Sequence, residues 1–413
     1  MKRDPEREGS AAAGALYRSI YVAFDNSADA LRAAEIGIAI ARATGACVTG
    51  SHVYAAALHD RRFRQMEGGL PERYLAEQKL SEQREIHDDL ITRGLRTISE
   101  CYLDVLDGKC RQAAVAFRRA ALQGRNWREL VRDIRGSSHD LVIMGAAGLG
   151  AVAASALGSV CERVARRIDR DLLVARACAE RHPGPIVAAI DGSARAFGAL
   201  KAALALGRML DKPVEAIAVY DPFFHYTAFR SISGVLSAEA ARVFRFEQQE
   251  KLHQDIIDSG LARIYRAHLA VAAKIAATEG VELRTELVSG KAFDRILAYA
   301  RERRAWLLAL GRSGVHAEPE SDLGATSENV LRAADCHVLL AATEHTPPAQ
   351  FVGESGIAWT AEARERMERV PPFVQRMARQ AVLAHAAKHG HSLITSDVID
   401  ACLDSMGATC PAR

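Results

Sequence analysis

The chain has 413 residues, of which 49% are hydrophobic and 25% charged, and its formal net charge is +3. This composition is ordinary for a globular protein of two or three domains, and the near-balanced charge gives no reason to expect nucleic-acid binding. Because no apolar run reaches the roughly 18 residues of a membrane span, we expect no membrane segment. The eight cysteines are scattered without a C-x-x-C pair, which is typical of reduced thiols and predicts a cytoplasmic protein.

The N-terminal stretch is charged and then rich in small residues, with no apolar run of signal-peptide length. We expect residues 1–16 to form a disordered leader. The first strand is predicted at Ser19–Phe24 and is followed by Asp25. Helical apolar spacing covers Asp29–Thr44, and Cys47–Tyr54 has the pattern of a second strand.

A long charged segment of helical pattern, from about Asp60 to Lys109, separates the second strand from the third. It contains Gly94, and since glycine weakens helices we expect a bend or a break there. Two interpretations of the segment stay open: a helix pair that packs on its own sheet, or an arm that binds a partner protein or a second chain. The third strand is predicted at Val115–Leu122 and the next helix at Trp127–Ile134.

The following strand, Leu141–Met144, runs into a glycine-bearing loop. Gly145, Gly148 and Gly158 have the spacing G-x2-G-x9-G, and Ser159 opens a helical pattern. Backbone amides and a helix N-terminus therefore gather at one point, which favours a bound anion. The Ser159 hydroxyl can either cap the helix or hydrogen-bond a phosphate oxygen. The spacing differs from both G-x4-G-K-[ST] and G-x-G-x-x-G.

The whole pattern occurs twice. Asp25, after the first strand, has the counterpart Asp191, which lies 166 residues later. The same offset relates Val53 to Val219, Gly124 to Gly290, Gly145 to Gly311, Gly148 to Gly314, and Gly158 to Gly324. We therefore expect two copies of one domain, at residues 17–178 and 183–344. Strands that alternate with helices predict a parallel sheet with both faces covered in each copy.

The remaining strands are predicted from short apolar runs. They are Leu172–Ala175 in the first copy and Pro185–Ile190, Val214–Tyr220, Val281–Val288, Trp306–Leu310 and Val338–Ala341 in the second. Ligands of parallel α/β sheets bind at the carboxyl ends of the strands, and both Asp25 and Gly145 follow strands. No nucleophile or histidine is paired with Asp25 in the sequence, so we predict binding and assign no catalytic residue.

Both copies resemble universal stress protein domains. The matching features are VAFDNS and AAIDGS after the first strands, Gln123-Gly124 and Ser289-Gly290, and the glycine spacing that this family writes as G-x2-G-x9-G-[ST]. The resemblance implies an α/β fold of the flavodoxin-like, adenine nucleotide alpha hydrolase-like type, with a five-stranded parallel sheet in each copy. It also implies that the two copies pair through their last strands as an intramolecular pseudo-dimer.

The resemblance further implies an adenine nucleotide, ATP alone or with Mg²⁺, over the strand ends of the first copy. Asp25 would lie near the nucleoside and Val53 would line the adenine. The groups that would hold ribose and phosphates are Gly145, Gly148, Gly158 and Ser159.

The second copy departs from the pattern, since Ala325 replaces the hydroxyl residue and Thr326 follows it. Its loop carries Glu318, Glu320 and Asp322, which would repel phosphates unless a divalent ion intervened. We therefore expect a weaker second site, formed by Asp191, Gly311, Gly314, Gly324 and Thr326.

Residues 355–407 predict a small all-α segment, with Thr360 and Thr395 as helix caps and Pro371-Pro372 as a break. The motifs W-T-x-E-A, V-P-x-F-V and a late I-T resemble the C-terminal helical region of the light-independent protochlorophyllide reductase B subunit. This implies a docking or regulatory module. His385 and His389 are one helical turn apart, but no acidic or cysteine ligand has matching spacing, so we assign no metal site.

Three functions follow from these observations. The first is an ATP-binding regulator or adaptor of the stress response. The second is a slow ATP hydrolase or phosphotransferase that uses a divalent ion at Asp25. The third is a nucleotide-free docking protein for a redox or tetrapyrrole enzyme. A homodimer or a protein partner, bound through the helical arms or the C-terminal segment, is compatible with all three.

Overall fold

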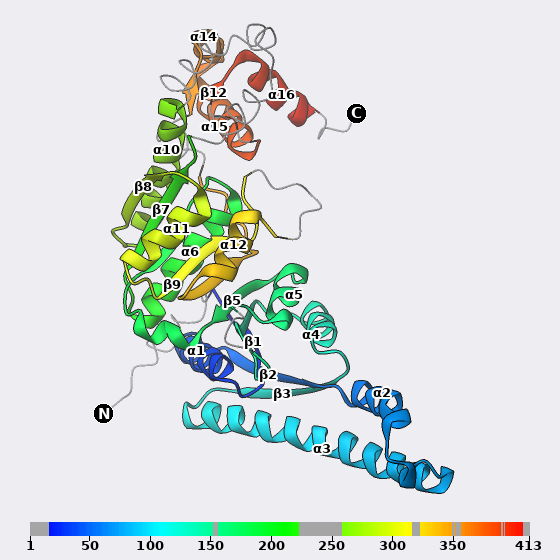
Figure 1. The fold of residues 1–413 in the computed structure, drawn as a ribbon. Helices are drawn as coiled ribbons and strands as arrows, with labels where there is room; N and C mark the ends of the chain where they lie inside the picture. Colours follow the sequence, from blue (N-terminus) through cyan, green and yellow to red (C-terminus); the bar gives the residue numbers. More distant parts are fainter. Residues whose placement is uncertain are drawn as a thin grey trace, which may run out of the picture.

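The computed structural model describes residues 16–151, 156–222, 258–315, 323–348, 351, 357–389, 391 and 393–407 (Figure 1). The predicted leader up to residue 15, the loop residues Glu318, Glu320 and Asp322, and most of the long charged segment of the second copy lie outside these ranges.

In the first copy, here called domain 1, five parallel strands alternate with helices as the sequence predicts. The strands are β1 (Ser19–Ala23), β2 (Cys47–Tyr54), β3 (Phe117–Gln123), β4 (Leu141–Gly145) and β5 (Asp171–Ala175), in the spatial order β3-β2-β1-β4-β5. β3 begins two residues later than predicted because the chain turns at Ala114, which has a φ of 55°.

The helices of domain 1 are α1 (Ala28–Thr44), α2 (Ala56–Met66), α3 (Glu77–Gln112), α4 (Asn126–Arg135) and α5 (Ser159–Arg167), with short 3₁₀ turns η2 (Glu67–Gly69), η3 (Glu72–Tyr74) and η4 (Ala177–Arg181). The expected break at Gly94 is wrong, because α3 runs unbroken for 36 residues. One glycine costs a helix only about 1 kcal/mol, which the packing of its C-terminal half on the sheet outweighs.

The second copy, here called domain 2, repeats this arrangement. Its strands are β6 (Ile186–Ala189), β7 (Val214–Tyr220), β8 (Arg284–Ser289), β9 (Leu307–Gly311) and β10 (His337–Ala341). Its described helices are α6 (Ala194–Leu210), α10 (Asp258–Thr278), α11 (Ala292–Glu302) and α12 (Ala325–Ala333). Gly260 lies in the first turn of the described part of α10.

The two five-stranded sheets form one sheet of ten strands, in the order β3-β2-β1-β4-β5-β10-β9-β6-β7-β8. All neighbours are parallel except β5 and β10, which pair antiparallel with Leu173 opposite Leu339. The last strand of each domain therefore lies against the last strand of the other, as in Figure 1. This confirms the fold class, and it shows that the two sheets are continuous across the domain boundary.

The core consists of two apolar layers, one on each face of the sheet. Side chains of α1, α3, α6 and α10 pack on one face, and those of α4, α5, α11 and α12 pack on the other. Both layers contain residues of domains 1 and 2. Among the described residues, no helix is long and apolar enough to cross a membrane.

The C-terminal segment forms a separate small core around Trp359, Met367 and Ile394. Its helices are α14 (Ala361–Glu368), α15 (Pro372–Lys388) and α16 (Ser396–Gly407), and Thr360 caps α14 by accepting from the Ala363 amide at 3.2 Å. The segment also contains two short paired strands, β11 (Ala358–Trp359) and β12 (Leu393–Ile394), which the sequence did not predict.

Candidate functional site

The structure contains a cavity of about 580 Å³ at the carboxyl ends of the strands of domain 2. This volume is in the range of small-molecule sites, about 300–1,000 Å³. Its walls come from the ends of β6, β7 and β9 and from α6, α10, α11 and α12. All five residues of the predicted second site line it: Asp191, Gly311, Gly314, Gly324 and Thr326.

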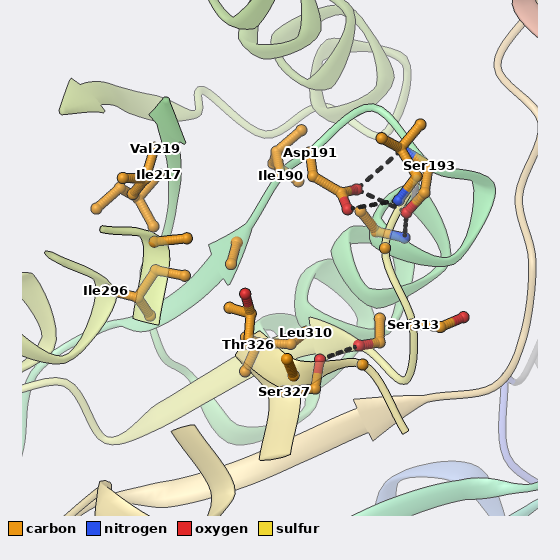
Figure 2. A pocket seen from close by; sticks show the side chains of 18 of the residues that line it. Ile190, Asp191, Ser193, Ile217, Val219, Ile296, Leu310, Ser313, Thr326 and Ser327 are labelled. Carbon is orange, nitrogen blue, oxygen red and sulfur yellow. Dashed lines mark hydrogen bonds between the residues drawn. The ribbon is translucent and has the colours of Figure 1, made fainter. Parts of the chain in front are cut away.

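The cavity is apolar at one end and polar at the other. Figure 2 shows the side chains of Ile217, Val219 and Ile296 gathered at one end, with Ser193 and Ser313 at the other. Thr326 and Ser327, from the first turn of α12, lie between them. The arrangement suits a ligand that has a flat apolar part and a polar or anionic part.

Hydrogen bonds of Asp191, which follows β6, connect the end of this strand to the glycine loop. Its Oδ2 accepts from the Val315 amide at 3.1 Å, and its Oδ1 accepts from the amide and hydroxyl of Ser193 at 2.9 and 2.6 Å (Figure 2). A Cβ at Gly314 would lie 2.5 Å from the same Oδ2. Glycine is therefore required at position 314 for the carboxylate to reach the loop.

Domain 1 has the same contact between strand and loop. Asp25 Oδ2 accepts from the Leu149 amide at 3.2 Å, its Oδ1 accepts from the Ser27 amide at 3.1 Å, and a Cβ at Gly148 would lie 2.5 Å from Oδ2. Gly145 lies close to the start of α1, since its Cβ would be 2.9 Å from the Ala30 amide nitrogen. Close contacts with the aspartate carboxylate, at Gly148 and Gly314, and with the start of the following helix, at Gly145 and Gly311, therefore explain these glycines in both domains, with or without a ligand.

The charge beside the loop differs between the domains. In domain 1, Asp29 accepts from the loop amide of Ala147 at 2.9 Å and from the amide of Ala177 at 2.7 Å. In domain 2 the counterpart of Asp29 is Arg195, whose guanidinium donates to the hydroxyl of Ser313. Domain 1 therefore has a second carboxylate at its loop, where domain 2 has a guanidinium that is paired with Glu344 at 3.2 Å.

The other predicted residues of domain 1 lie around the same strand ends. Val53 is 6% exposed and packs in the core with Tyr21 and Leu130. Gly158 is the N-cap of α5, and Ser159 is the first helical residue and is exposed. The Ser159 hydroxyl therefore does not cap the helix, and of the two roles predicted for it only the phosphate contact stays open.

Several lining residues were not predicted from the sequence. They are Ile217, Ala292 and Ile296, from β7 and α11, and Tyr265 from α10. Their counterparts at the 166-residue offset are Ser51, Asn126, Leu130 and Ser99. A comparison of the two copies position by position would have found the difference, because Ser51 and Asn126 are polar where domain 2 is apolar.

Burial controls the titration of two groups of α10 near Asp191. Burial raises the pKa of the Tyr265 phenol, and the charge of Asp191 raises it further. Burial lowers the pKa of the His268 imidazole, against the opposing effect of Asp191. Both side chains are therefore held neutral near pH 7. In the part of the chain that the structure describes, no cluster of three metal-ligating side chains occurs.

Two family models match the chain. The universal stress protein family matches residues 16–176 and again 184–342, and the proto-chlorophyllide reductase 57 kD subunit family matches residues 359–402. No curated protein matches the chain.

Several solved structures that are similar to this chain carry the name universal stress protein. One from Archaeoglobus fulgidus has 16% identity and a TM-score of 0.48, with 78% of this chain and 97% of that chain covered. A protein from Pseudomonas aeruginosa has 14% identity and a TM-score of 0.48, with 83% and 98% covered. A universal stress protein in complex with cAMP has 21% identity and a TM-score of 0.26, with 39% and 98% covered.

The two matches of the universal stress protein family together cover well over half of the chain, and they coincide with the two halves of the ten-stranded sheet. The C-terminal match coincides with the separate core around Trp359. The chain therefore belongs to the universal stress protein family, as a tandem protein that carries a C-terminal helical segment similar to a part of protochlorophyllide reductase.

Proposed function

We propose that this protein is a nucleotide-dependent regulator or adaptor of the stress response, and that an adenine nucleotide binds in the cavity of domain 2. One observation carries the proposal: an apolar recess and a glycine loop at a helix N-terminus meet in a single cavity of about 580 Å³. A purine requires the recess, and phosphates require the loop.

The apolar end suits a purine, because Ile217, Val219 and Ile296 offer aliphatic surface to its faces. The polar end suits phosphates. The backbone around Gly311 and Gly314 and the N-terminus of the nine-residue helix α12 form one wall, and hydroxyls of Thr326 and Ser327 lie beside it. The guanidinium of Arg195 donates to Ser313 at this end and is also paired with Glu344, at 3.2 Å from Nε to Oε1, which offsets part of its charge.

The proposal reverses the order of affinity expected from the sequence, which favoured domain 1. That expectation depended on Ala325, which replaces the hydroxyl residue at the start of α12, and on Glu318, Glu320 and Asp322, which lie outside the described residues. At the corresponding loop of domain 1, Asp29 accepts a loop amide beside Asp25, whereas the described part of the domain 2 loop has only Asp191, so domain 1 has one carboxylate more near the proposed phosphate position. Repulsion between like charges makes domain 1 the weaker site in this proposal.

Binding is favoured over hydrolysis in domain 2. A general base needs a free lone pair directed at the attacking water. Asp191 instead accepts three hydrogen bonds from Ser193 and Val315, which fix it as a support for the loop. Mg²⁺ bound to the phosphates would offset the charge of Asp191. A regulator in the cytoplasm is consistent with the seven described cysteines, all of which are free thiols.

The test has two parts. The purified protein is denatured and the released small molecules are identified by mass spectrometry. Binding of ATP, ADP, AMP and cAMP to nucleotide-free protein is then measured by calorimetry, with and without Mg²⁺. The proposal expects one tight adenine-nucleotide site per chain, in domain 2, with any binding to domain 1 weaker. It is rejected if none of the four binds below about 1 mM, which corresponds to roughly −4 kcal/mol.

A further inference from the structure

The outer side of α4 and α5 carries a group of arginines. The two helices lie side by side in domain 1 (Figure 1), and their buried residues, such as Leu130 and Val164, belong to the core on that face of the sheet. Four guanidiniums lie around the half-buried indole of Trp127, with their Cζ atoms 4.8–5.8 Å from the ring centroid. We call these four residues the arginine cluster: Arg125, Arg128, Arg163 and Arg167.

The charge of the cluster is not balanced within the described part of the chain, where none of the four guanidiniums forms an ion pair with a carboxylate. The acidic residues that adjoin Arg128 and Arg163 in the sequence are paired elsewhere. Glu129 lies 2.9 Å from Arg132, and Glu162 lies 2.5 Å from Arg332. Arg167 donates to the backbone carbonyl of Arg163 at 3.1 Å, which does not neutralise its charge.

The four charges are close enough to repel one another. Because each Cζ atom lies within 5.8 Å of one centroid, no two of them are more than about 12 Å apart, which is near the Debye length of about 10 Å at 0.1 M salt. The electron-rich faces of the indole attract the guanidiniums, but the ring carries no net charge. An anion bound from solution would therefore relieve a repulsion that the described residues leave unbalanced.

Domain 2 lacks the cluster, although its helices α11 and α12 correspond to α4 and α5. At the 166-residue offset Phe293 replaces Trp127, and Lys291 lies over the Phe293 ring at 5.1 Å. The other three arginines of the cluster are replaced by Asp294, Asn329 and Ala333. The fold therefore does not require four arginines at these positions, and the cluster is particular to domain 1.

We propose that the arginine cluster binds a small anion made of linked phosphate groups, an inorganic oligophosphate, at a site separate from the cavity of domain 2. A guanidinium offers a planar fork of donors that matches two oxygens of a phosphate group. Guanidiniums spread around an indole cannot all face a single phosphate ion, whereas a chain of phosphates can pass from one to the next. The number and spread of the charges therefore favour several linked phosphates.

Two observations favour such an anion over a nucleic acid or a membrane. A nucleic-acid base needs an exposed aromatic face for stacking, but the indole of Trp127 is half-buried and guanidiniums lie over it. A membrane-binding helix presents large apolar side chains beside its cations, and α4 and α5, which are described in full, have no exposed side chain of this kind. The surface offers charge alone, which suits a compact anion.

The first experiment measures binding of sodium tripolyphosphate and of orthophosphate to the full-length protein by calorimetry, at low salt and without Mg²⁺. We expect tripolyphosphate to bind at least about tenfold more tightly, because it contacts more guanidiniums. The triple variant Arg128→Asp/Arg163→Asn/Arg167→Ala takes the residues of domain 2 at these positions. Its affinity for tripolyphosphate should be at least about 30-fold weaker.

A single arginine on an indole supplies the matched control. Arg379 lies 5.5 Å from the ring centroid of Trp359 and is the one described cation over that ring. Arg379→Gln should change the affinity for tripolyphosphate by less than about twofold. The same titration in Gly314→Ala, whose domain 2 loop is strained, separates the two sites of the chain, because binding to the arginine cluster should be unchanged there.

Tripolyphosphate that fails to bind below about 1 mM overturns the proposal. So does binding that the triple variant retains, because the phosphates would then be held elsewhere. Single-stranded DNA and phosphatidylglycerol vesicles are titrated in parallel, and the proposal is wrong if either needs the cluster and displaces tripolyphosphate. The triple variant loses cations that repel one another, so it should melt no lower than the wild type, and lost binding cannot then be ascribed to unfolding.

The second experiment locates the anion through the fluorescence of Trp127. Phosphates that draw the guanidiniums away from the indole should change its emission. Trp127→Phe, which takes the residue of domain 2, should abolish this change, while the affinity measured by calorimetry falls by less than about threefold. The other two tryptophans, Trp306 and Trp359, supply a constant background. A change in emission that persists in Trp127→Phe would place the anion beside another tryptophan and overturn the assignment of the site.

Discussion

The strand ends of domain 1 and domain 2 share one backbone arrangement and differ in the charged residue beside the glycine loop. In each, an aspartate after the first strand accepts the amide that follows the second glycine of the loop, from Leu149 in domain 1 and from Val315 in domain 2. Beside this contact domain 1 has the carboxylate of Asp29, whereas domain 2 has the guanidinium of Arg195. In domain 2 this guanidinium, which is also paired with Glu344, lies near the cavity whose apolar end contains Ile217 and Ile296.

The comparison separates two reasons for a glycine motif. The contact between Asp25 and the loop requires Gly148 whether or not a nucleotide is present, so the motif can persist in a domain that binds nothing. A binding site also needs space for the base and favourable charge for the phosphates, and neither is part of the motif.

The largest effect is expected from the second glycine of each loop. Gly314→Ala and Gly148→Ala are a matched pair, because the new methyl group would lie 2.5 Å from an aspartate Oδ2 in both. Each should push the carboxylate away from the loop. Since we place the nucleotide in domain 2, Gly314→Ala should weaken ATP binding by about 30-fold or more, roughly 2 kcal/mol, and Gly148→Ala by less than about twofold. Calorimetry on both variants checks this.

The opposite result, with Gly148→Ala abolishing binding and Gly314→Ala leaving it intact, would restore the order of sites expected from the sequence. Equal losses would indicate two sites of similar affinity. Thermal unfolding of both variants serves as the control, since the two strained loops should lower the melting temperature to a similar extent.

The two domains also differ in a buried carboxylate, which domain 2 has and domain 1 lacks at the equivalent position. Glu215 on β7 is 6% exposed and accepts from Arg303 Nε at 3.0 Å and from the Tyr299 hydroxyl at 2.8 Å. Domain 1 has Thr49 at this position, and there the phenol of Tyr21 donates to Asp133 instead. Burial would raise the pKa of the Glu215 carboxyl, but the hydrogen bonds from Arg303 and Tyr299 outweigh it and hold the pKa below its ordinary value.

Glu215→Gln should therefore lower the free energy of unfolding by about 1–2 kcal/mol at pH 7, a range reduced because Arg303 is partly exposed to solvent. A depressed carboxyl pKa stabilises the fold above the unfolded value, near 4.3, and this contribution is lost as the pH falls through the folded pKa. Urea unfolding should thus show the difference between wild type and variant shrinking below about pH 4. Glu282→Gln, at an exposed position, should show no such trend. A constant difference from pH 7 to pH 3 would contradict the assignment.

The charge beside the loop should have a smaller effect. Arg195→Asp gives domain 2 the residue of domain 1 and should weaken ATP binding about three- to tenfold, less at high salt. Arg208→Asp, on the solvent side of the same helix, is the control and should change affinity by less than about twofold. In the Gly314→Ala background, Asp29→Asn should increase the residual affinity of domain 1. If the Arg195→Asp variant binds ATP as tightly as the wild type, the charge beside the loop does not determine which of the two domains has the higher affinity.

Most of the fold could be predicted because the same order of strands, helices and glycines occurs twice in the sequence. Each predicted strand agreed with its copy at the 166-residue offset, and alternating strands and helices limit the sheet to the parallel kind. The prediction at Gly94 failed because it considered only the local propensity of one residue. The two-residue strands β11 and β12 could not be found, since a ladder of two pairs leaves no periodic pattern in the sequence.

The candidate site could be predicted only in part, for a physical reason. Glycine spacing reveals where the backbone makes close contacts, and all five residues predicted for the second site do line one cavity. The size of that cavity depends on side chains that converge from β7, α10 and α11, which are far apart in the sequence. Whether Asp29 or Arg195 faces a phosphate depends on hydrogen bonds that only the folded chain defines.

The smallest effects are expected where the two domains meet. Arg332 and Glu162 form an ion pair at 2.5 Å, and Arg166 pairs with Glu328, which is the same contact after exchange of the two domains. The side chains of Glu162 and Glu328 are 34% and 22% exposed, and each should therefore contribute about 0.5 kcal/mol or less. Glu162→Gln and Glu328→Gln should lower the free energy of unfolding in urea by equal amounts, and both effects should vanish near 1 M NaCl, where the Debye length is about 3 Å. The two domains pair strand to strand, as identical subunits would. A large loss for one variant and none for the other would show that the two ion pairs nevertheless contribute unequally to the stability of the domain interface.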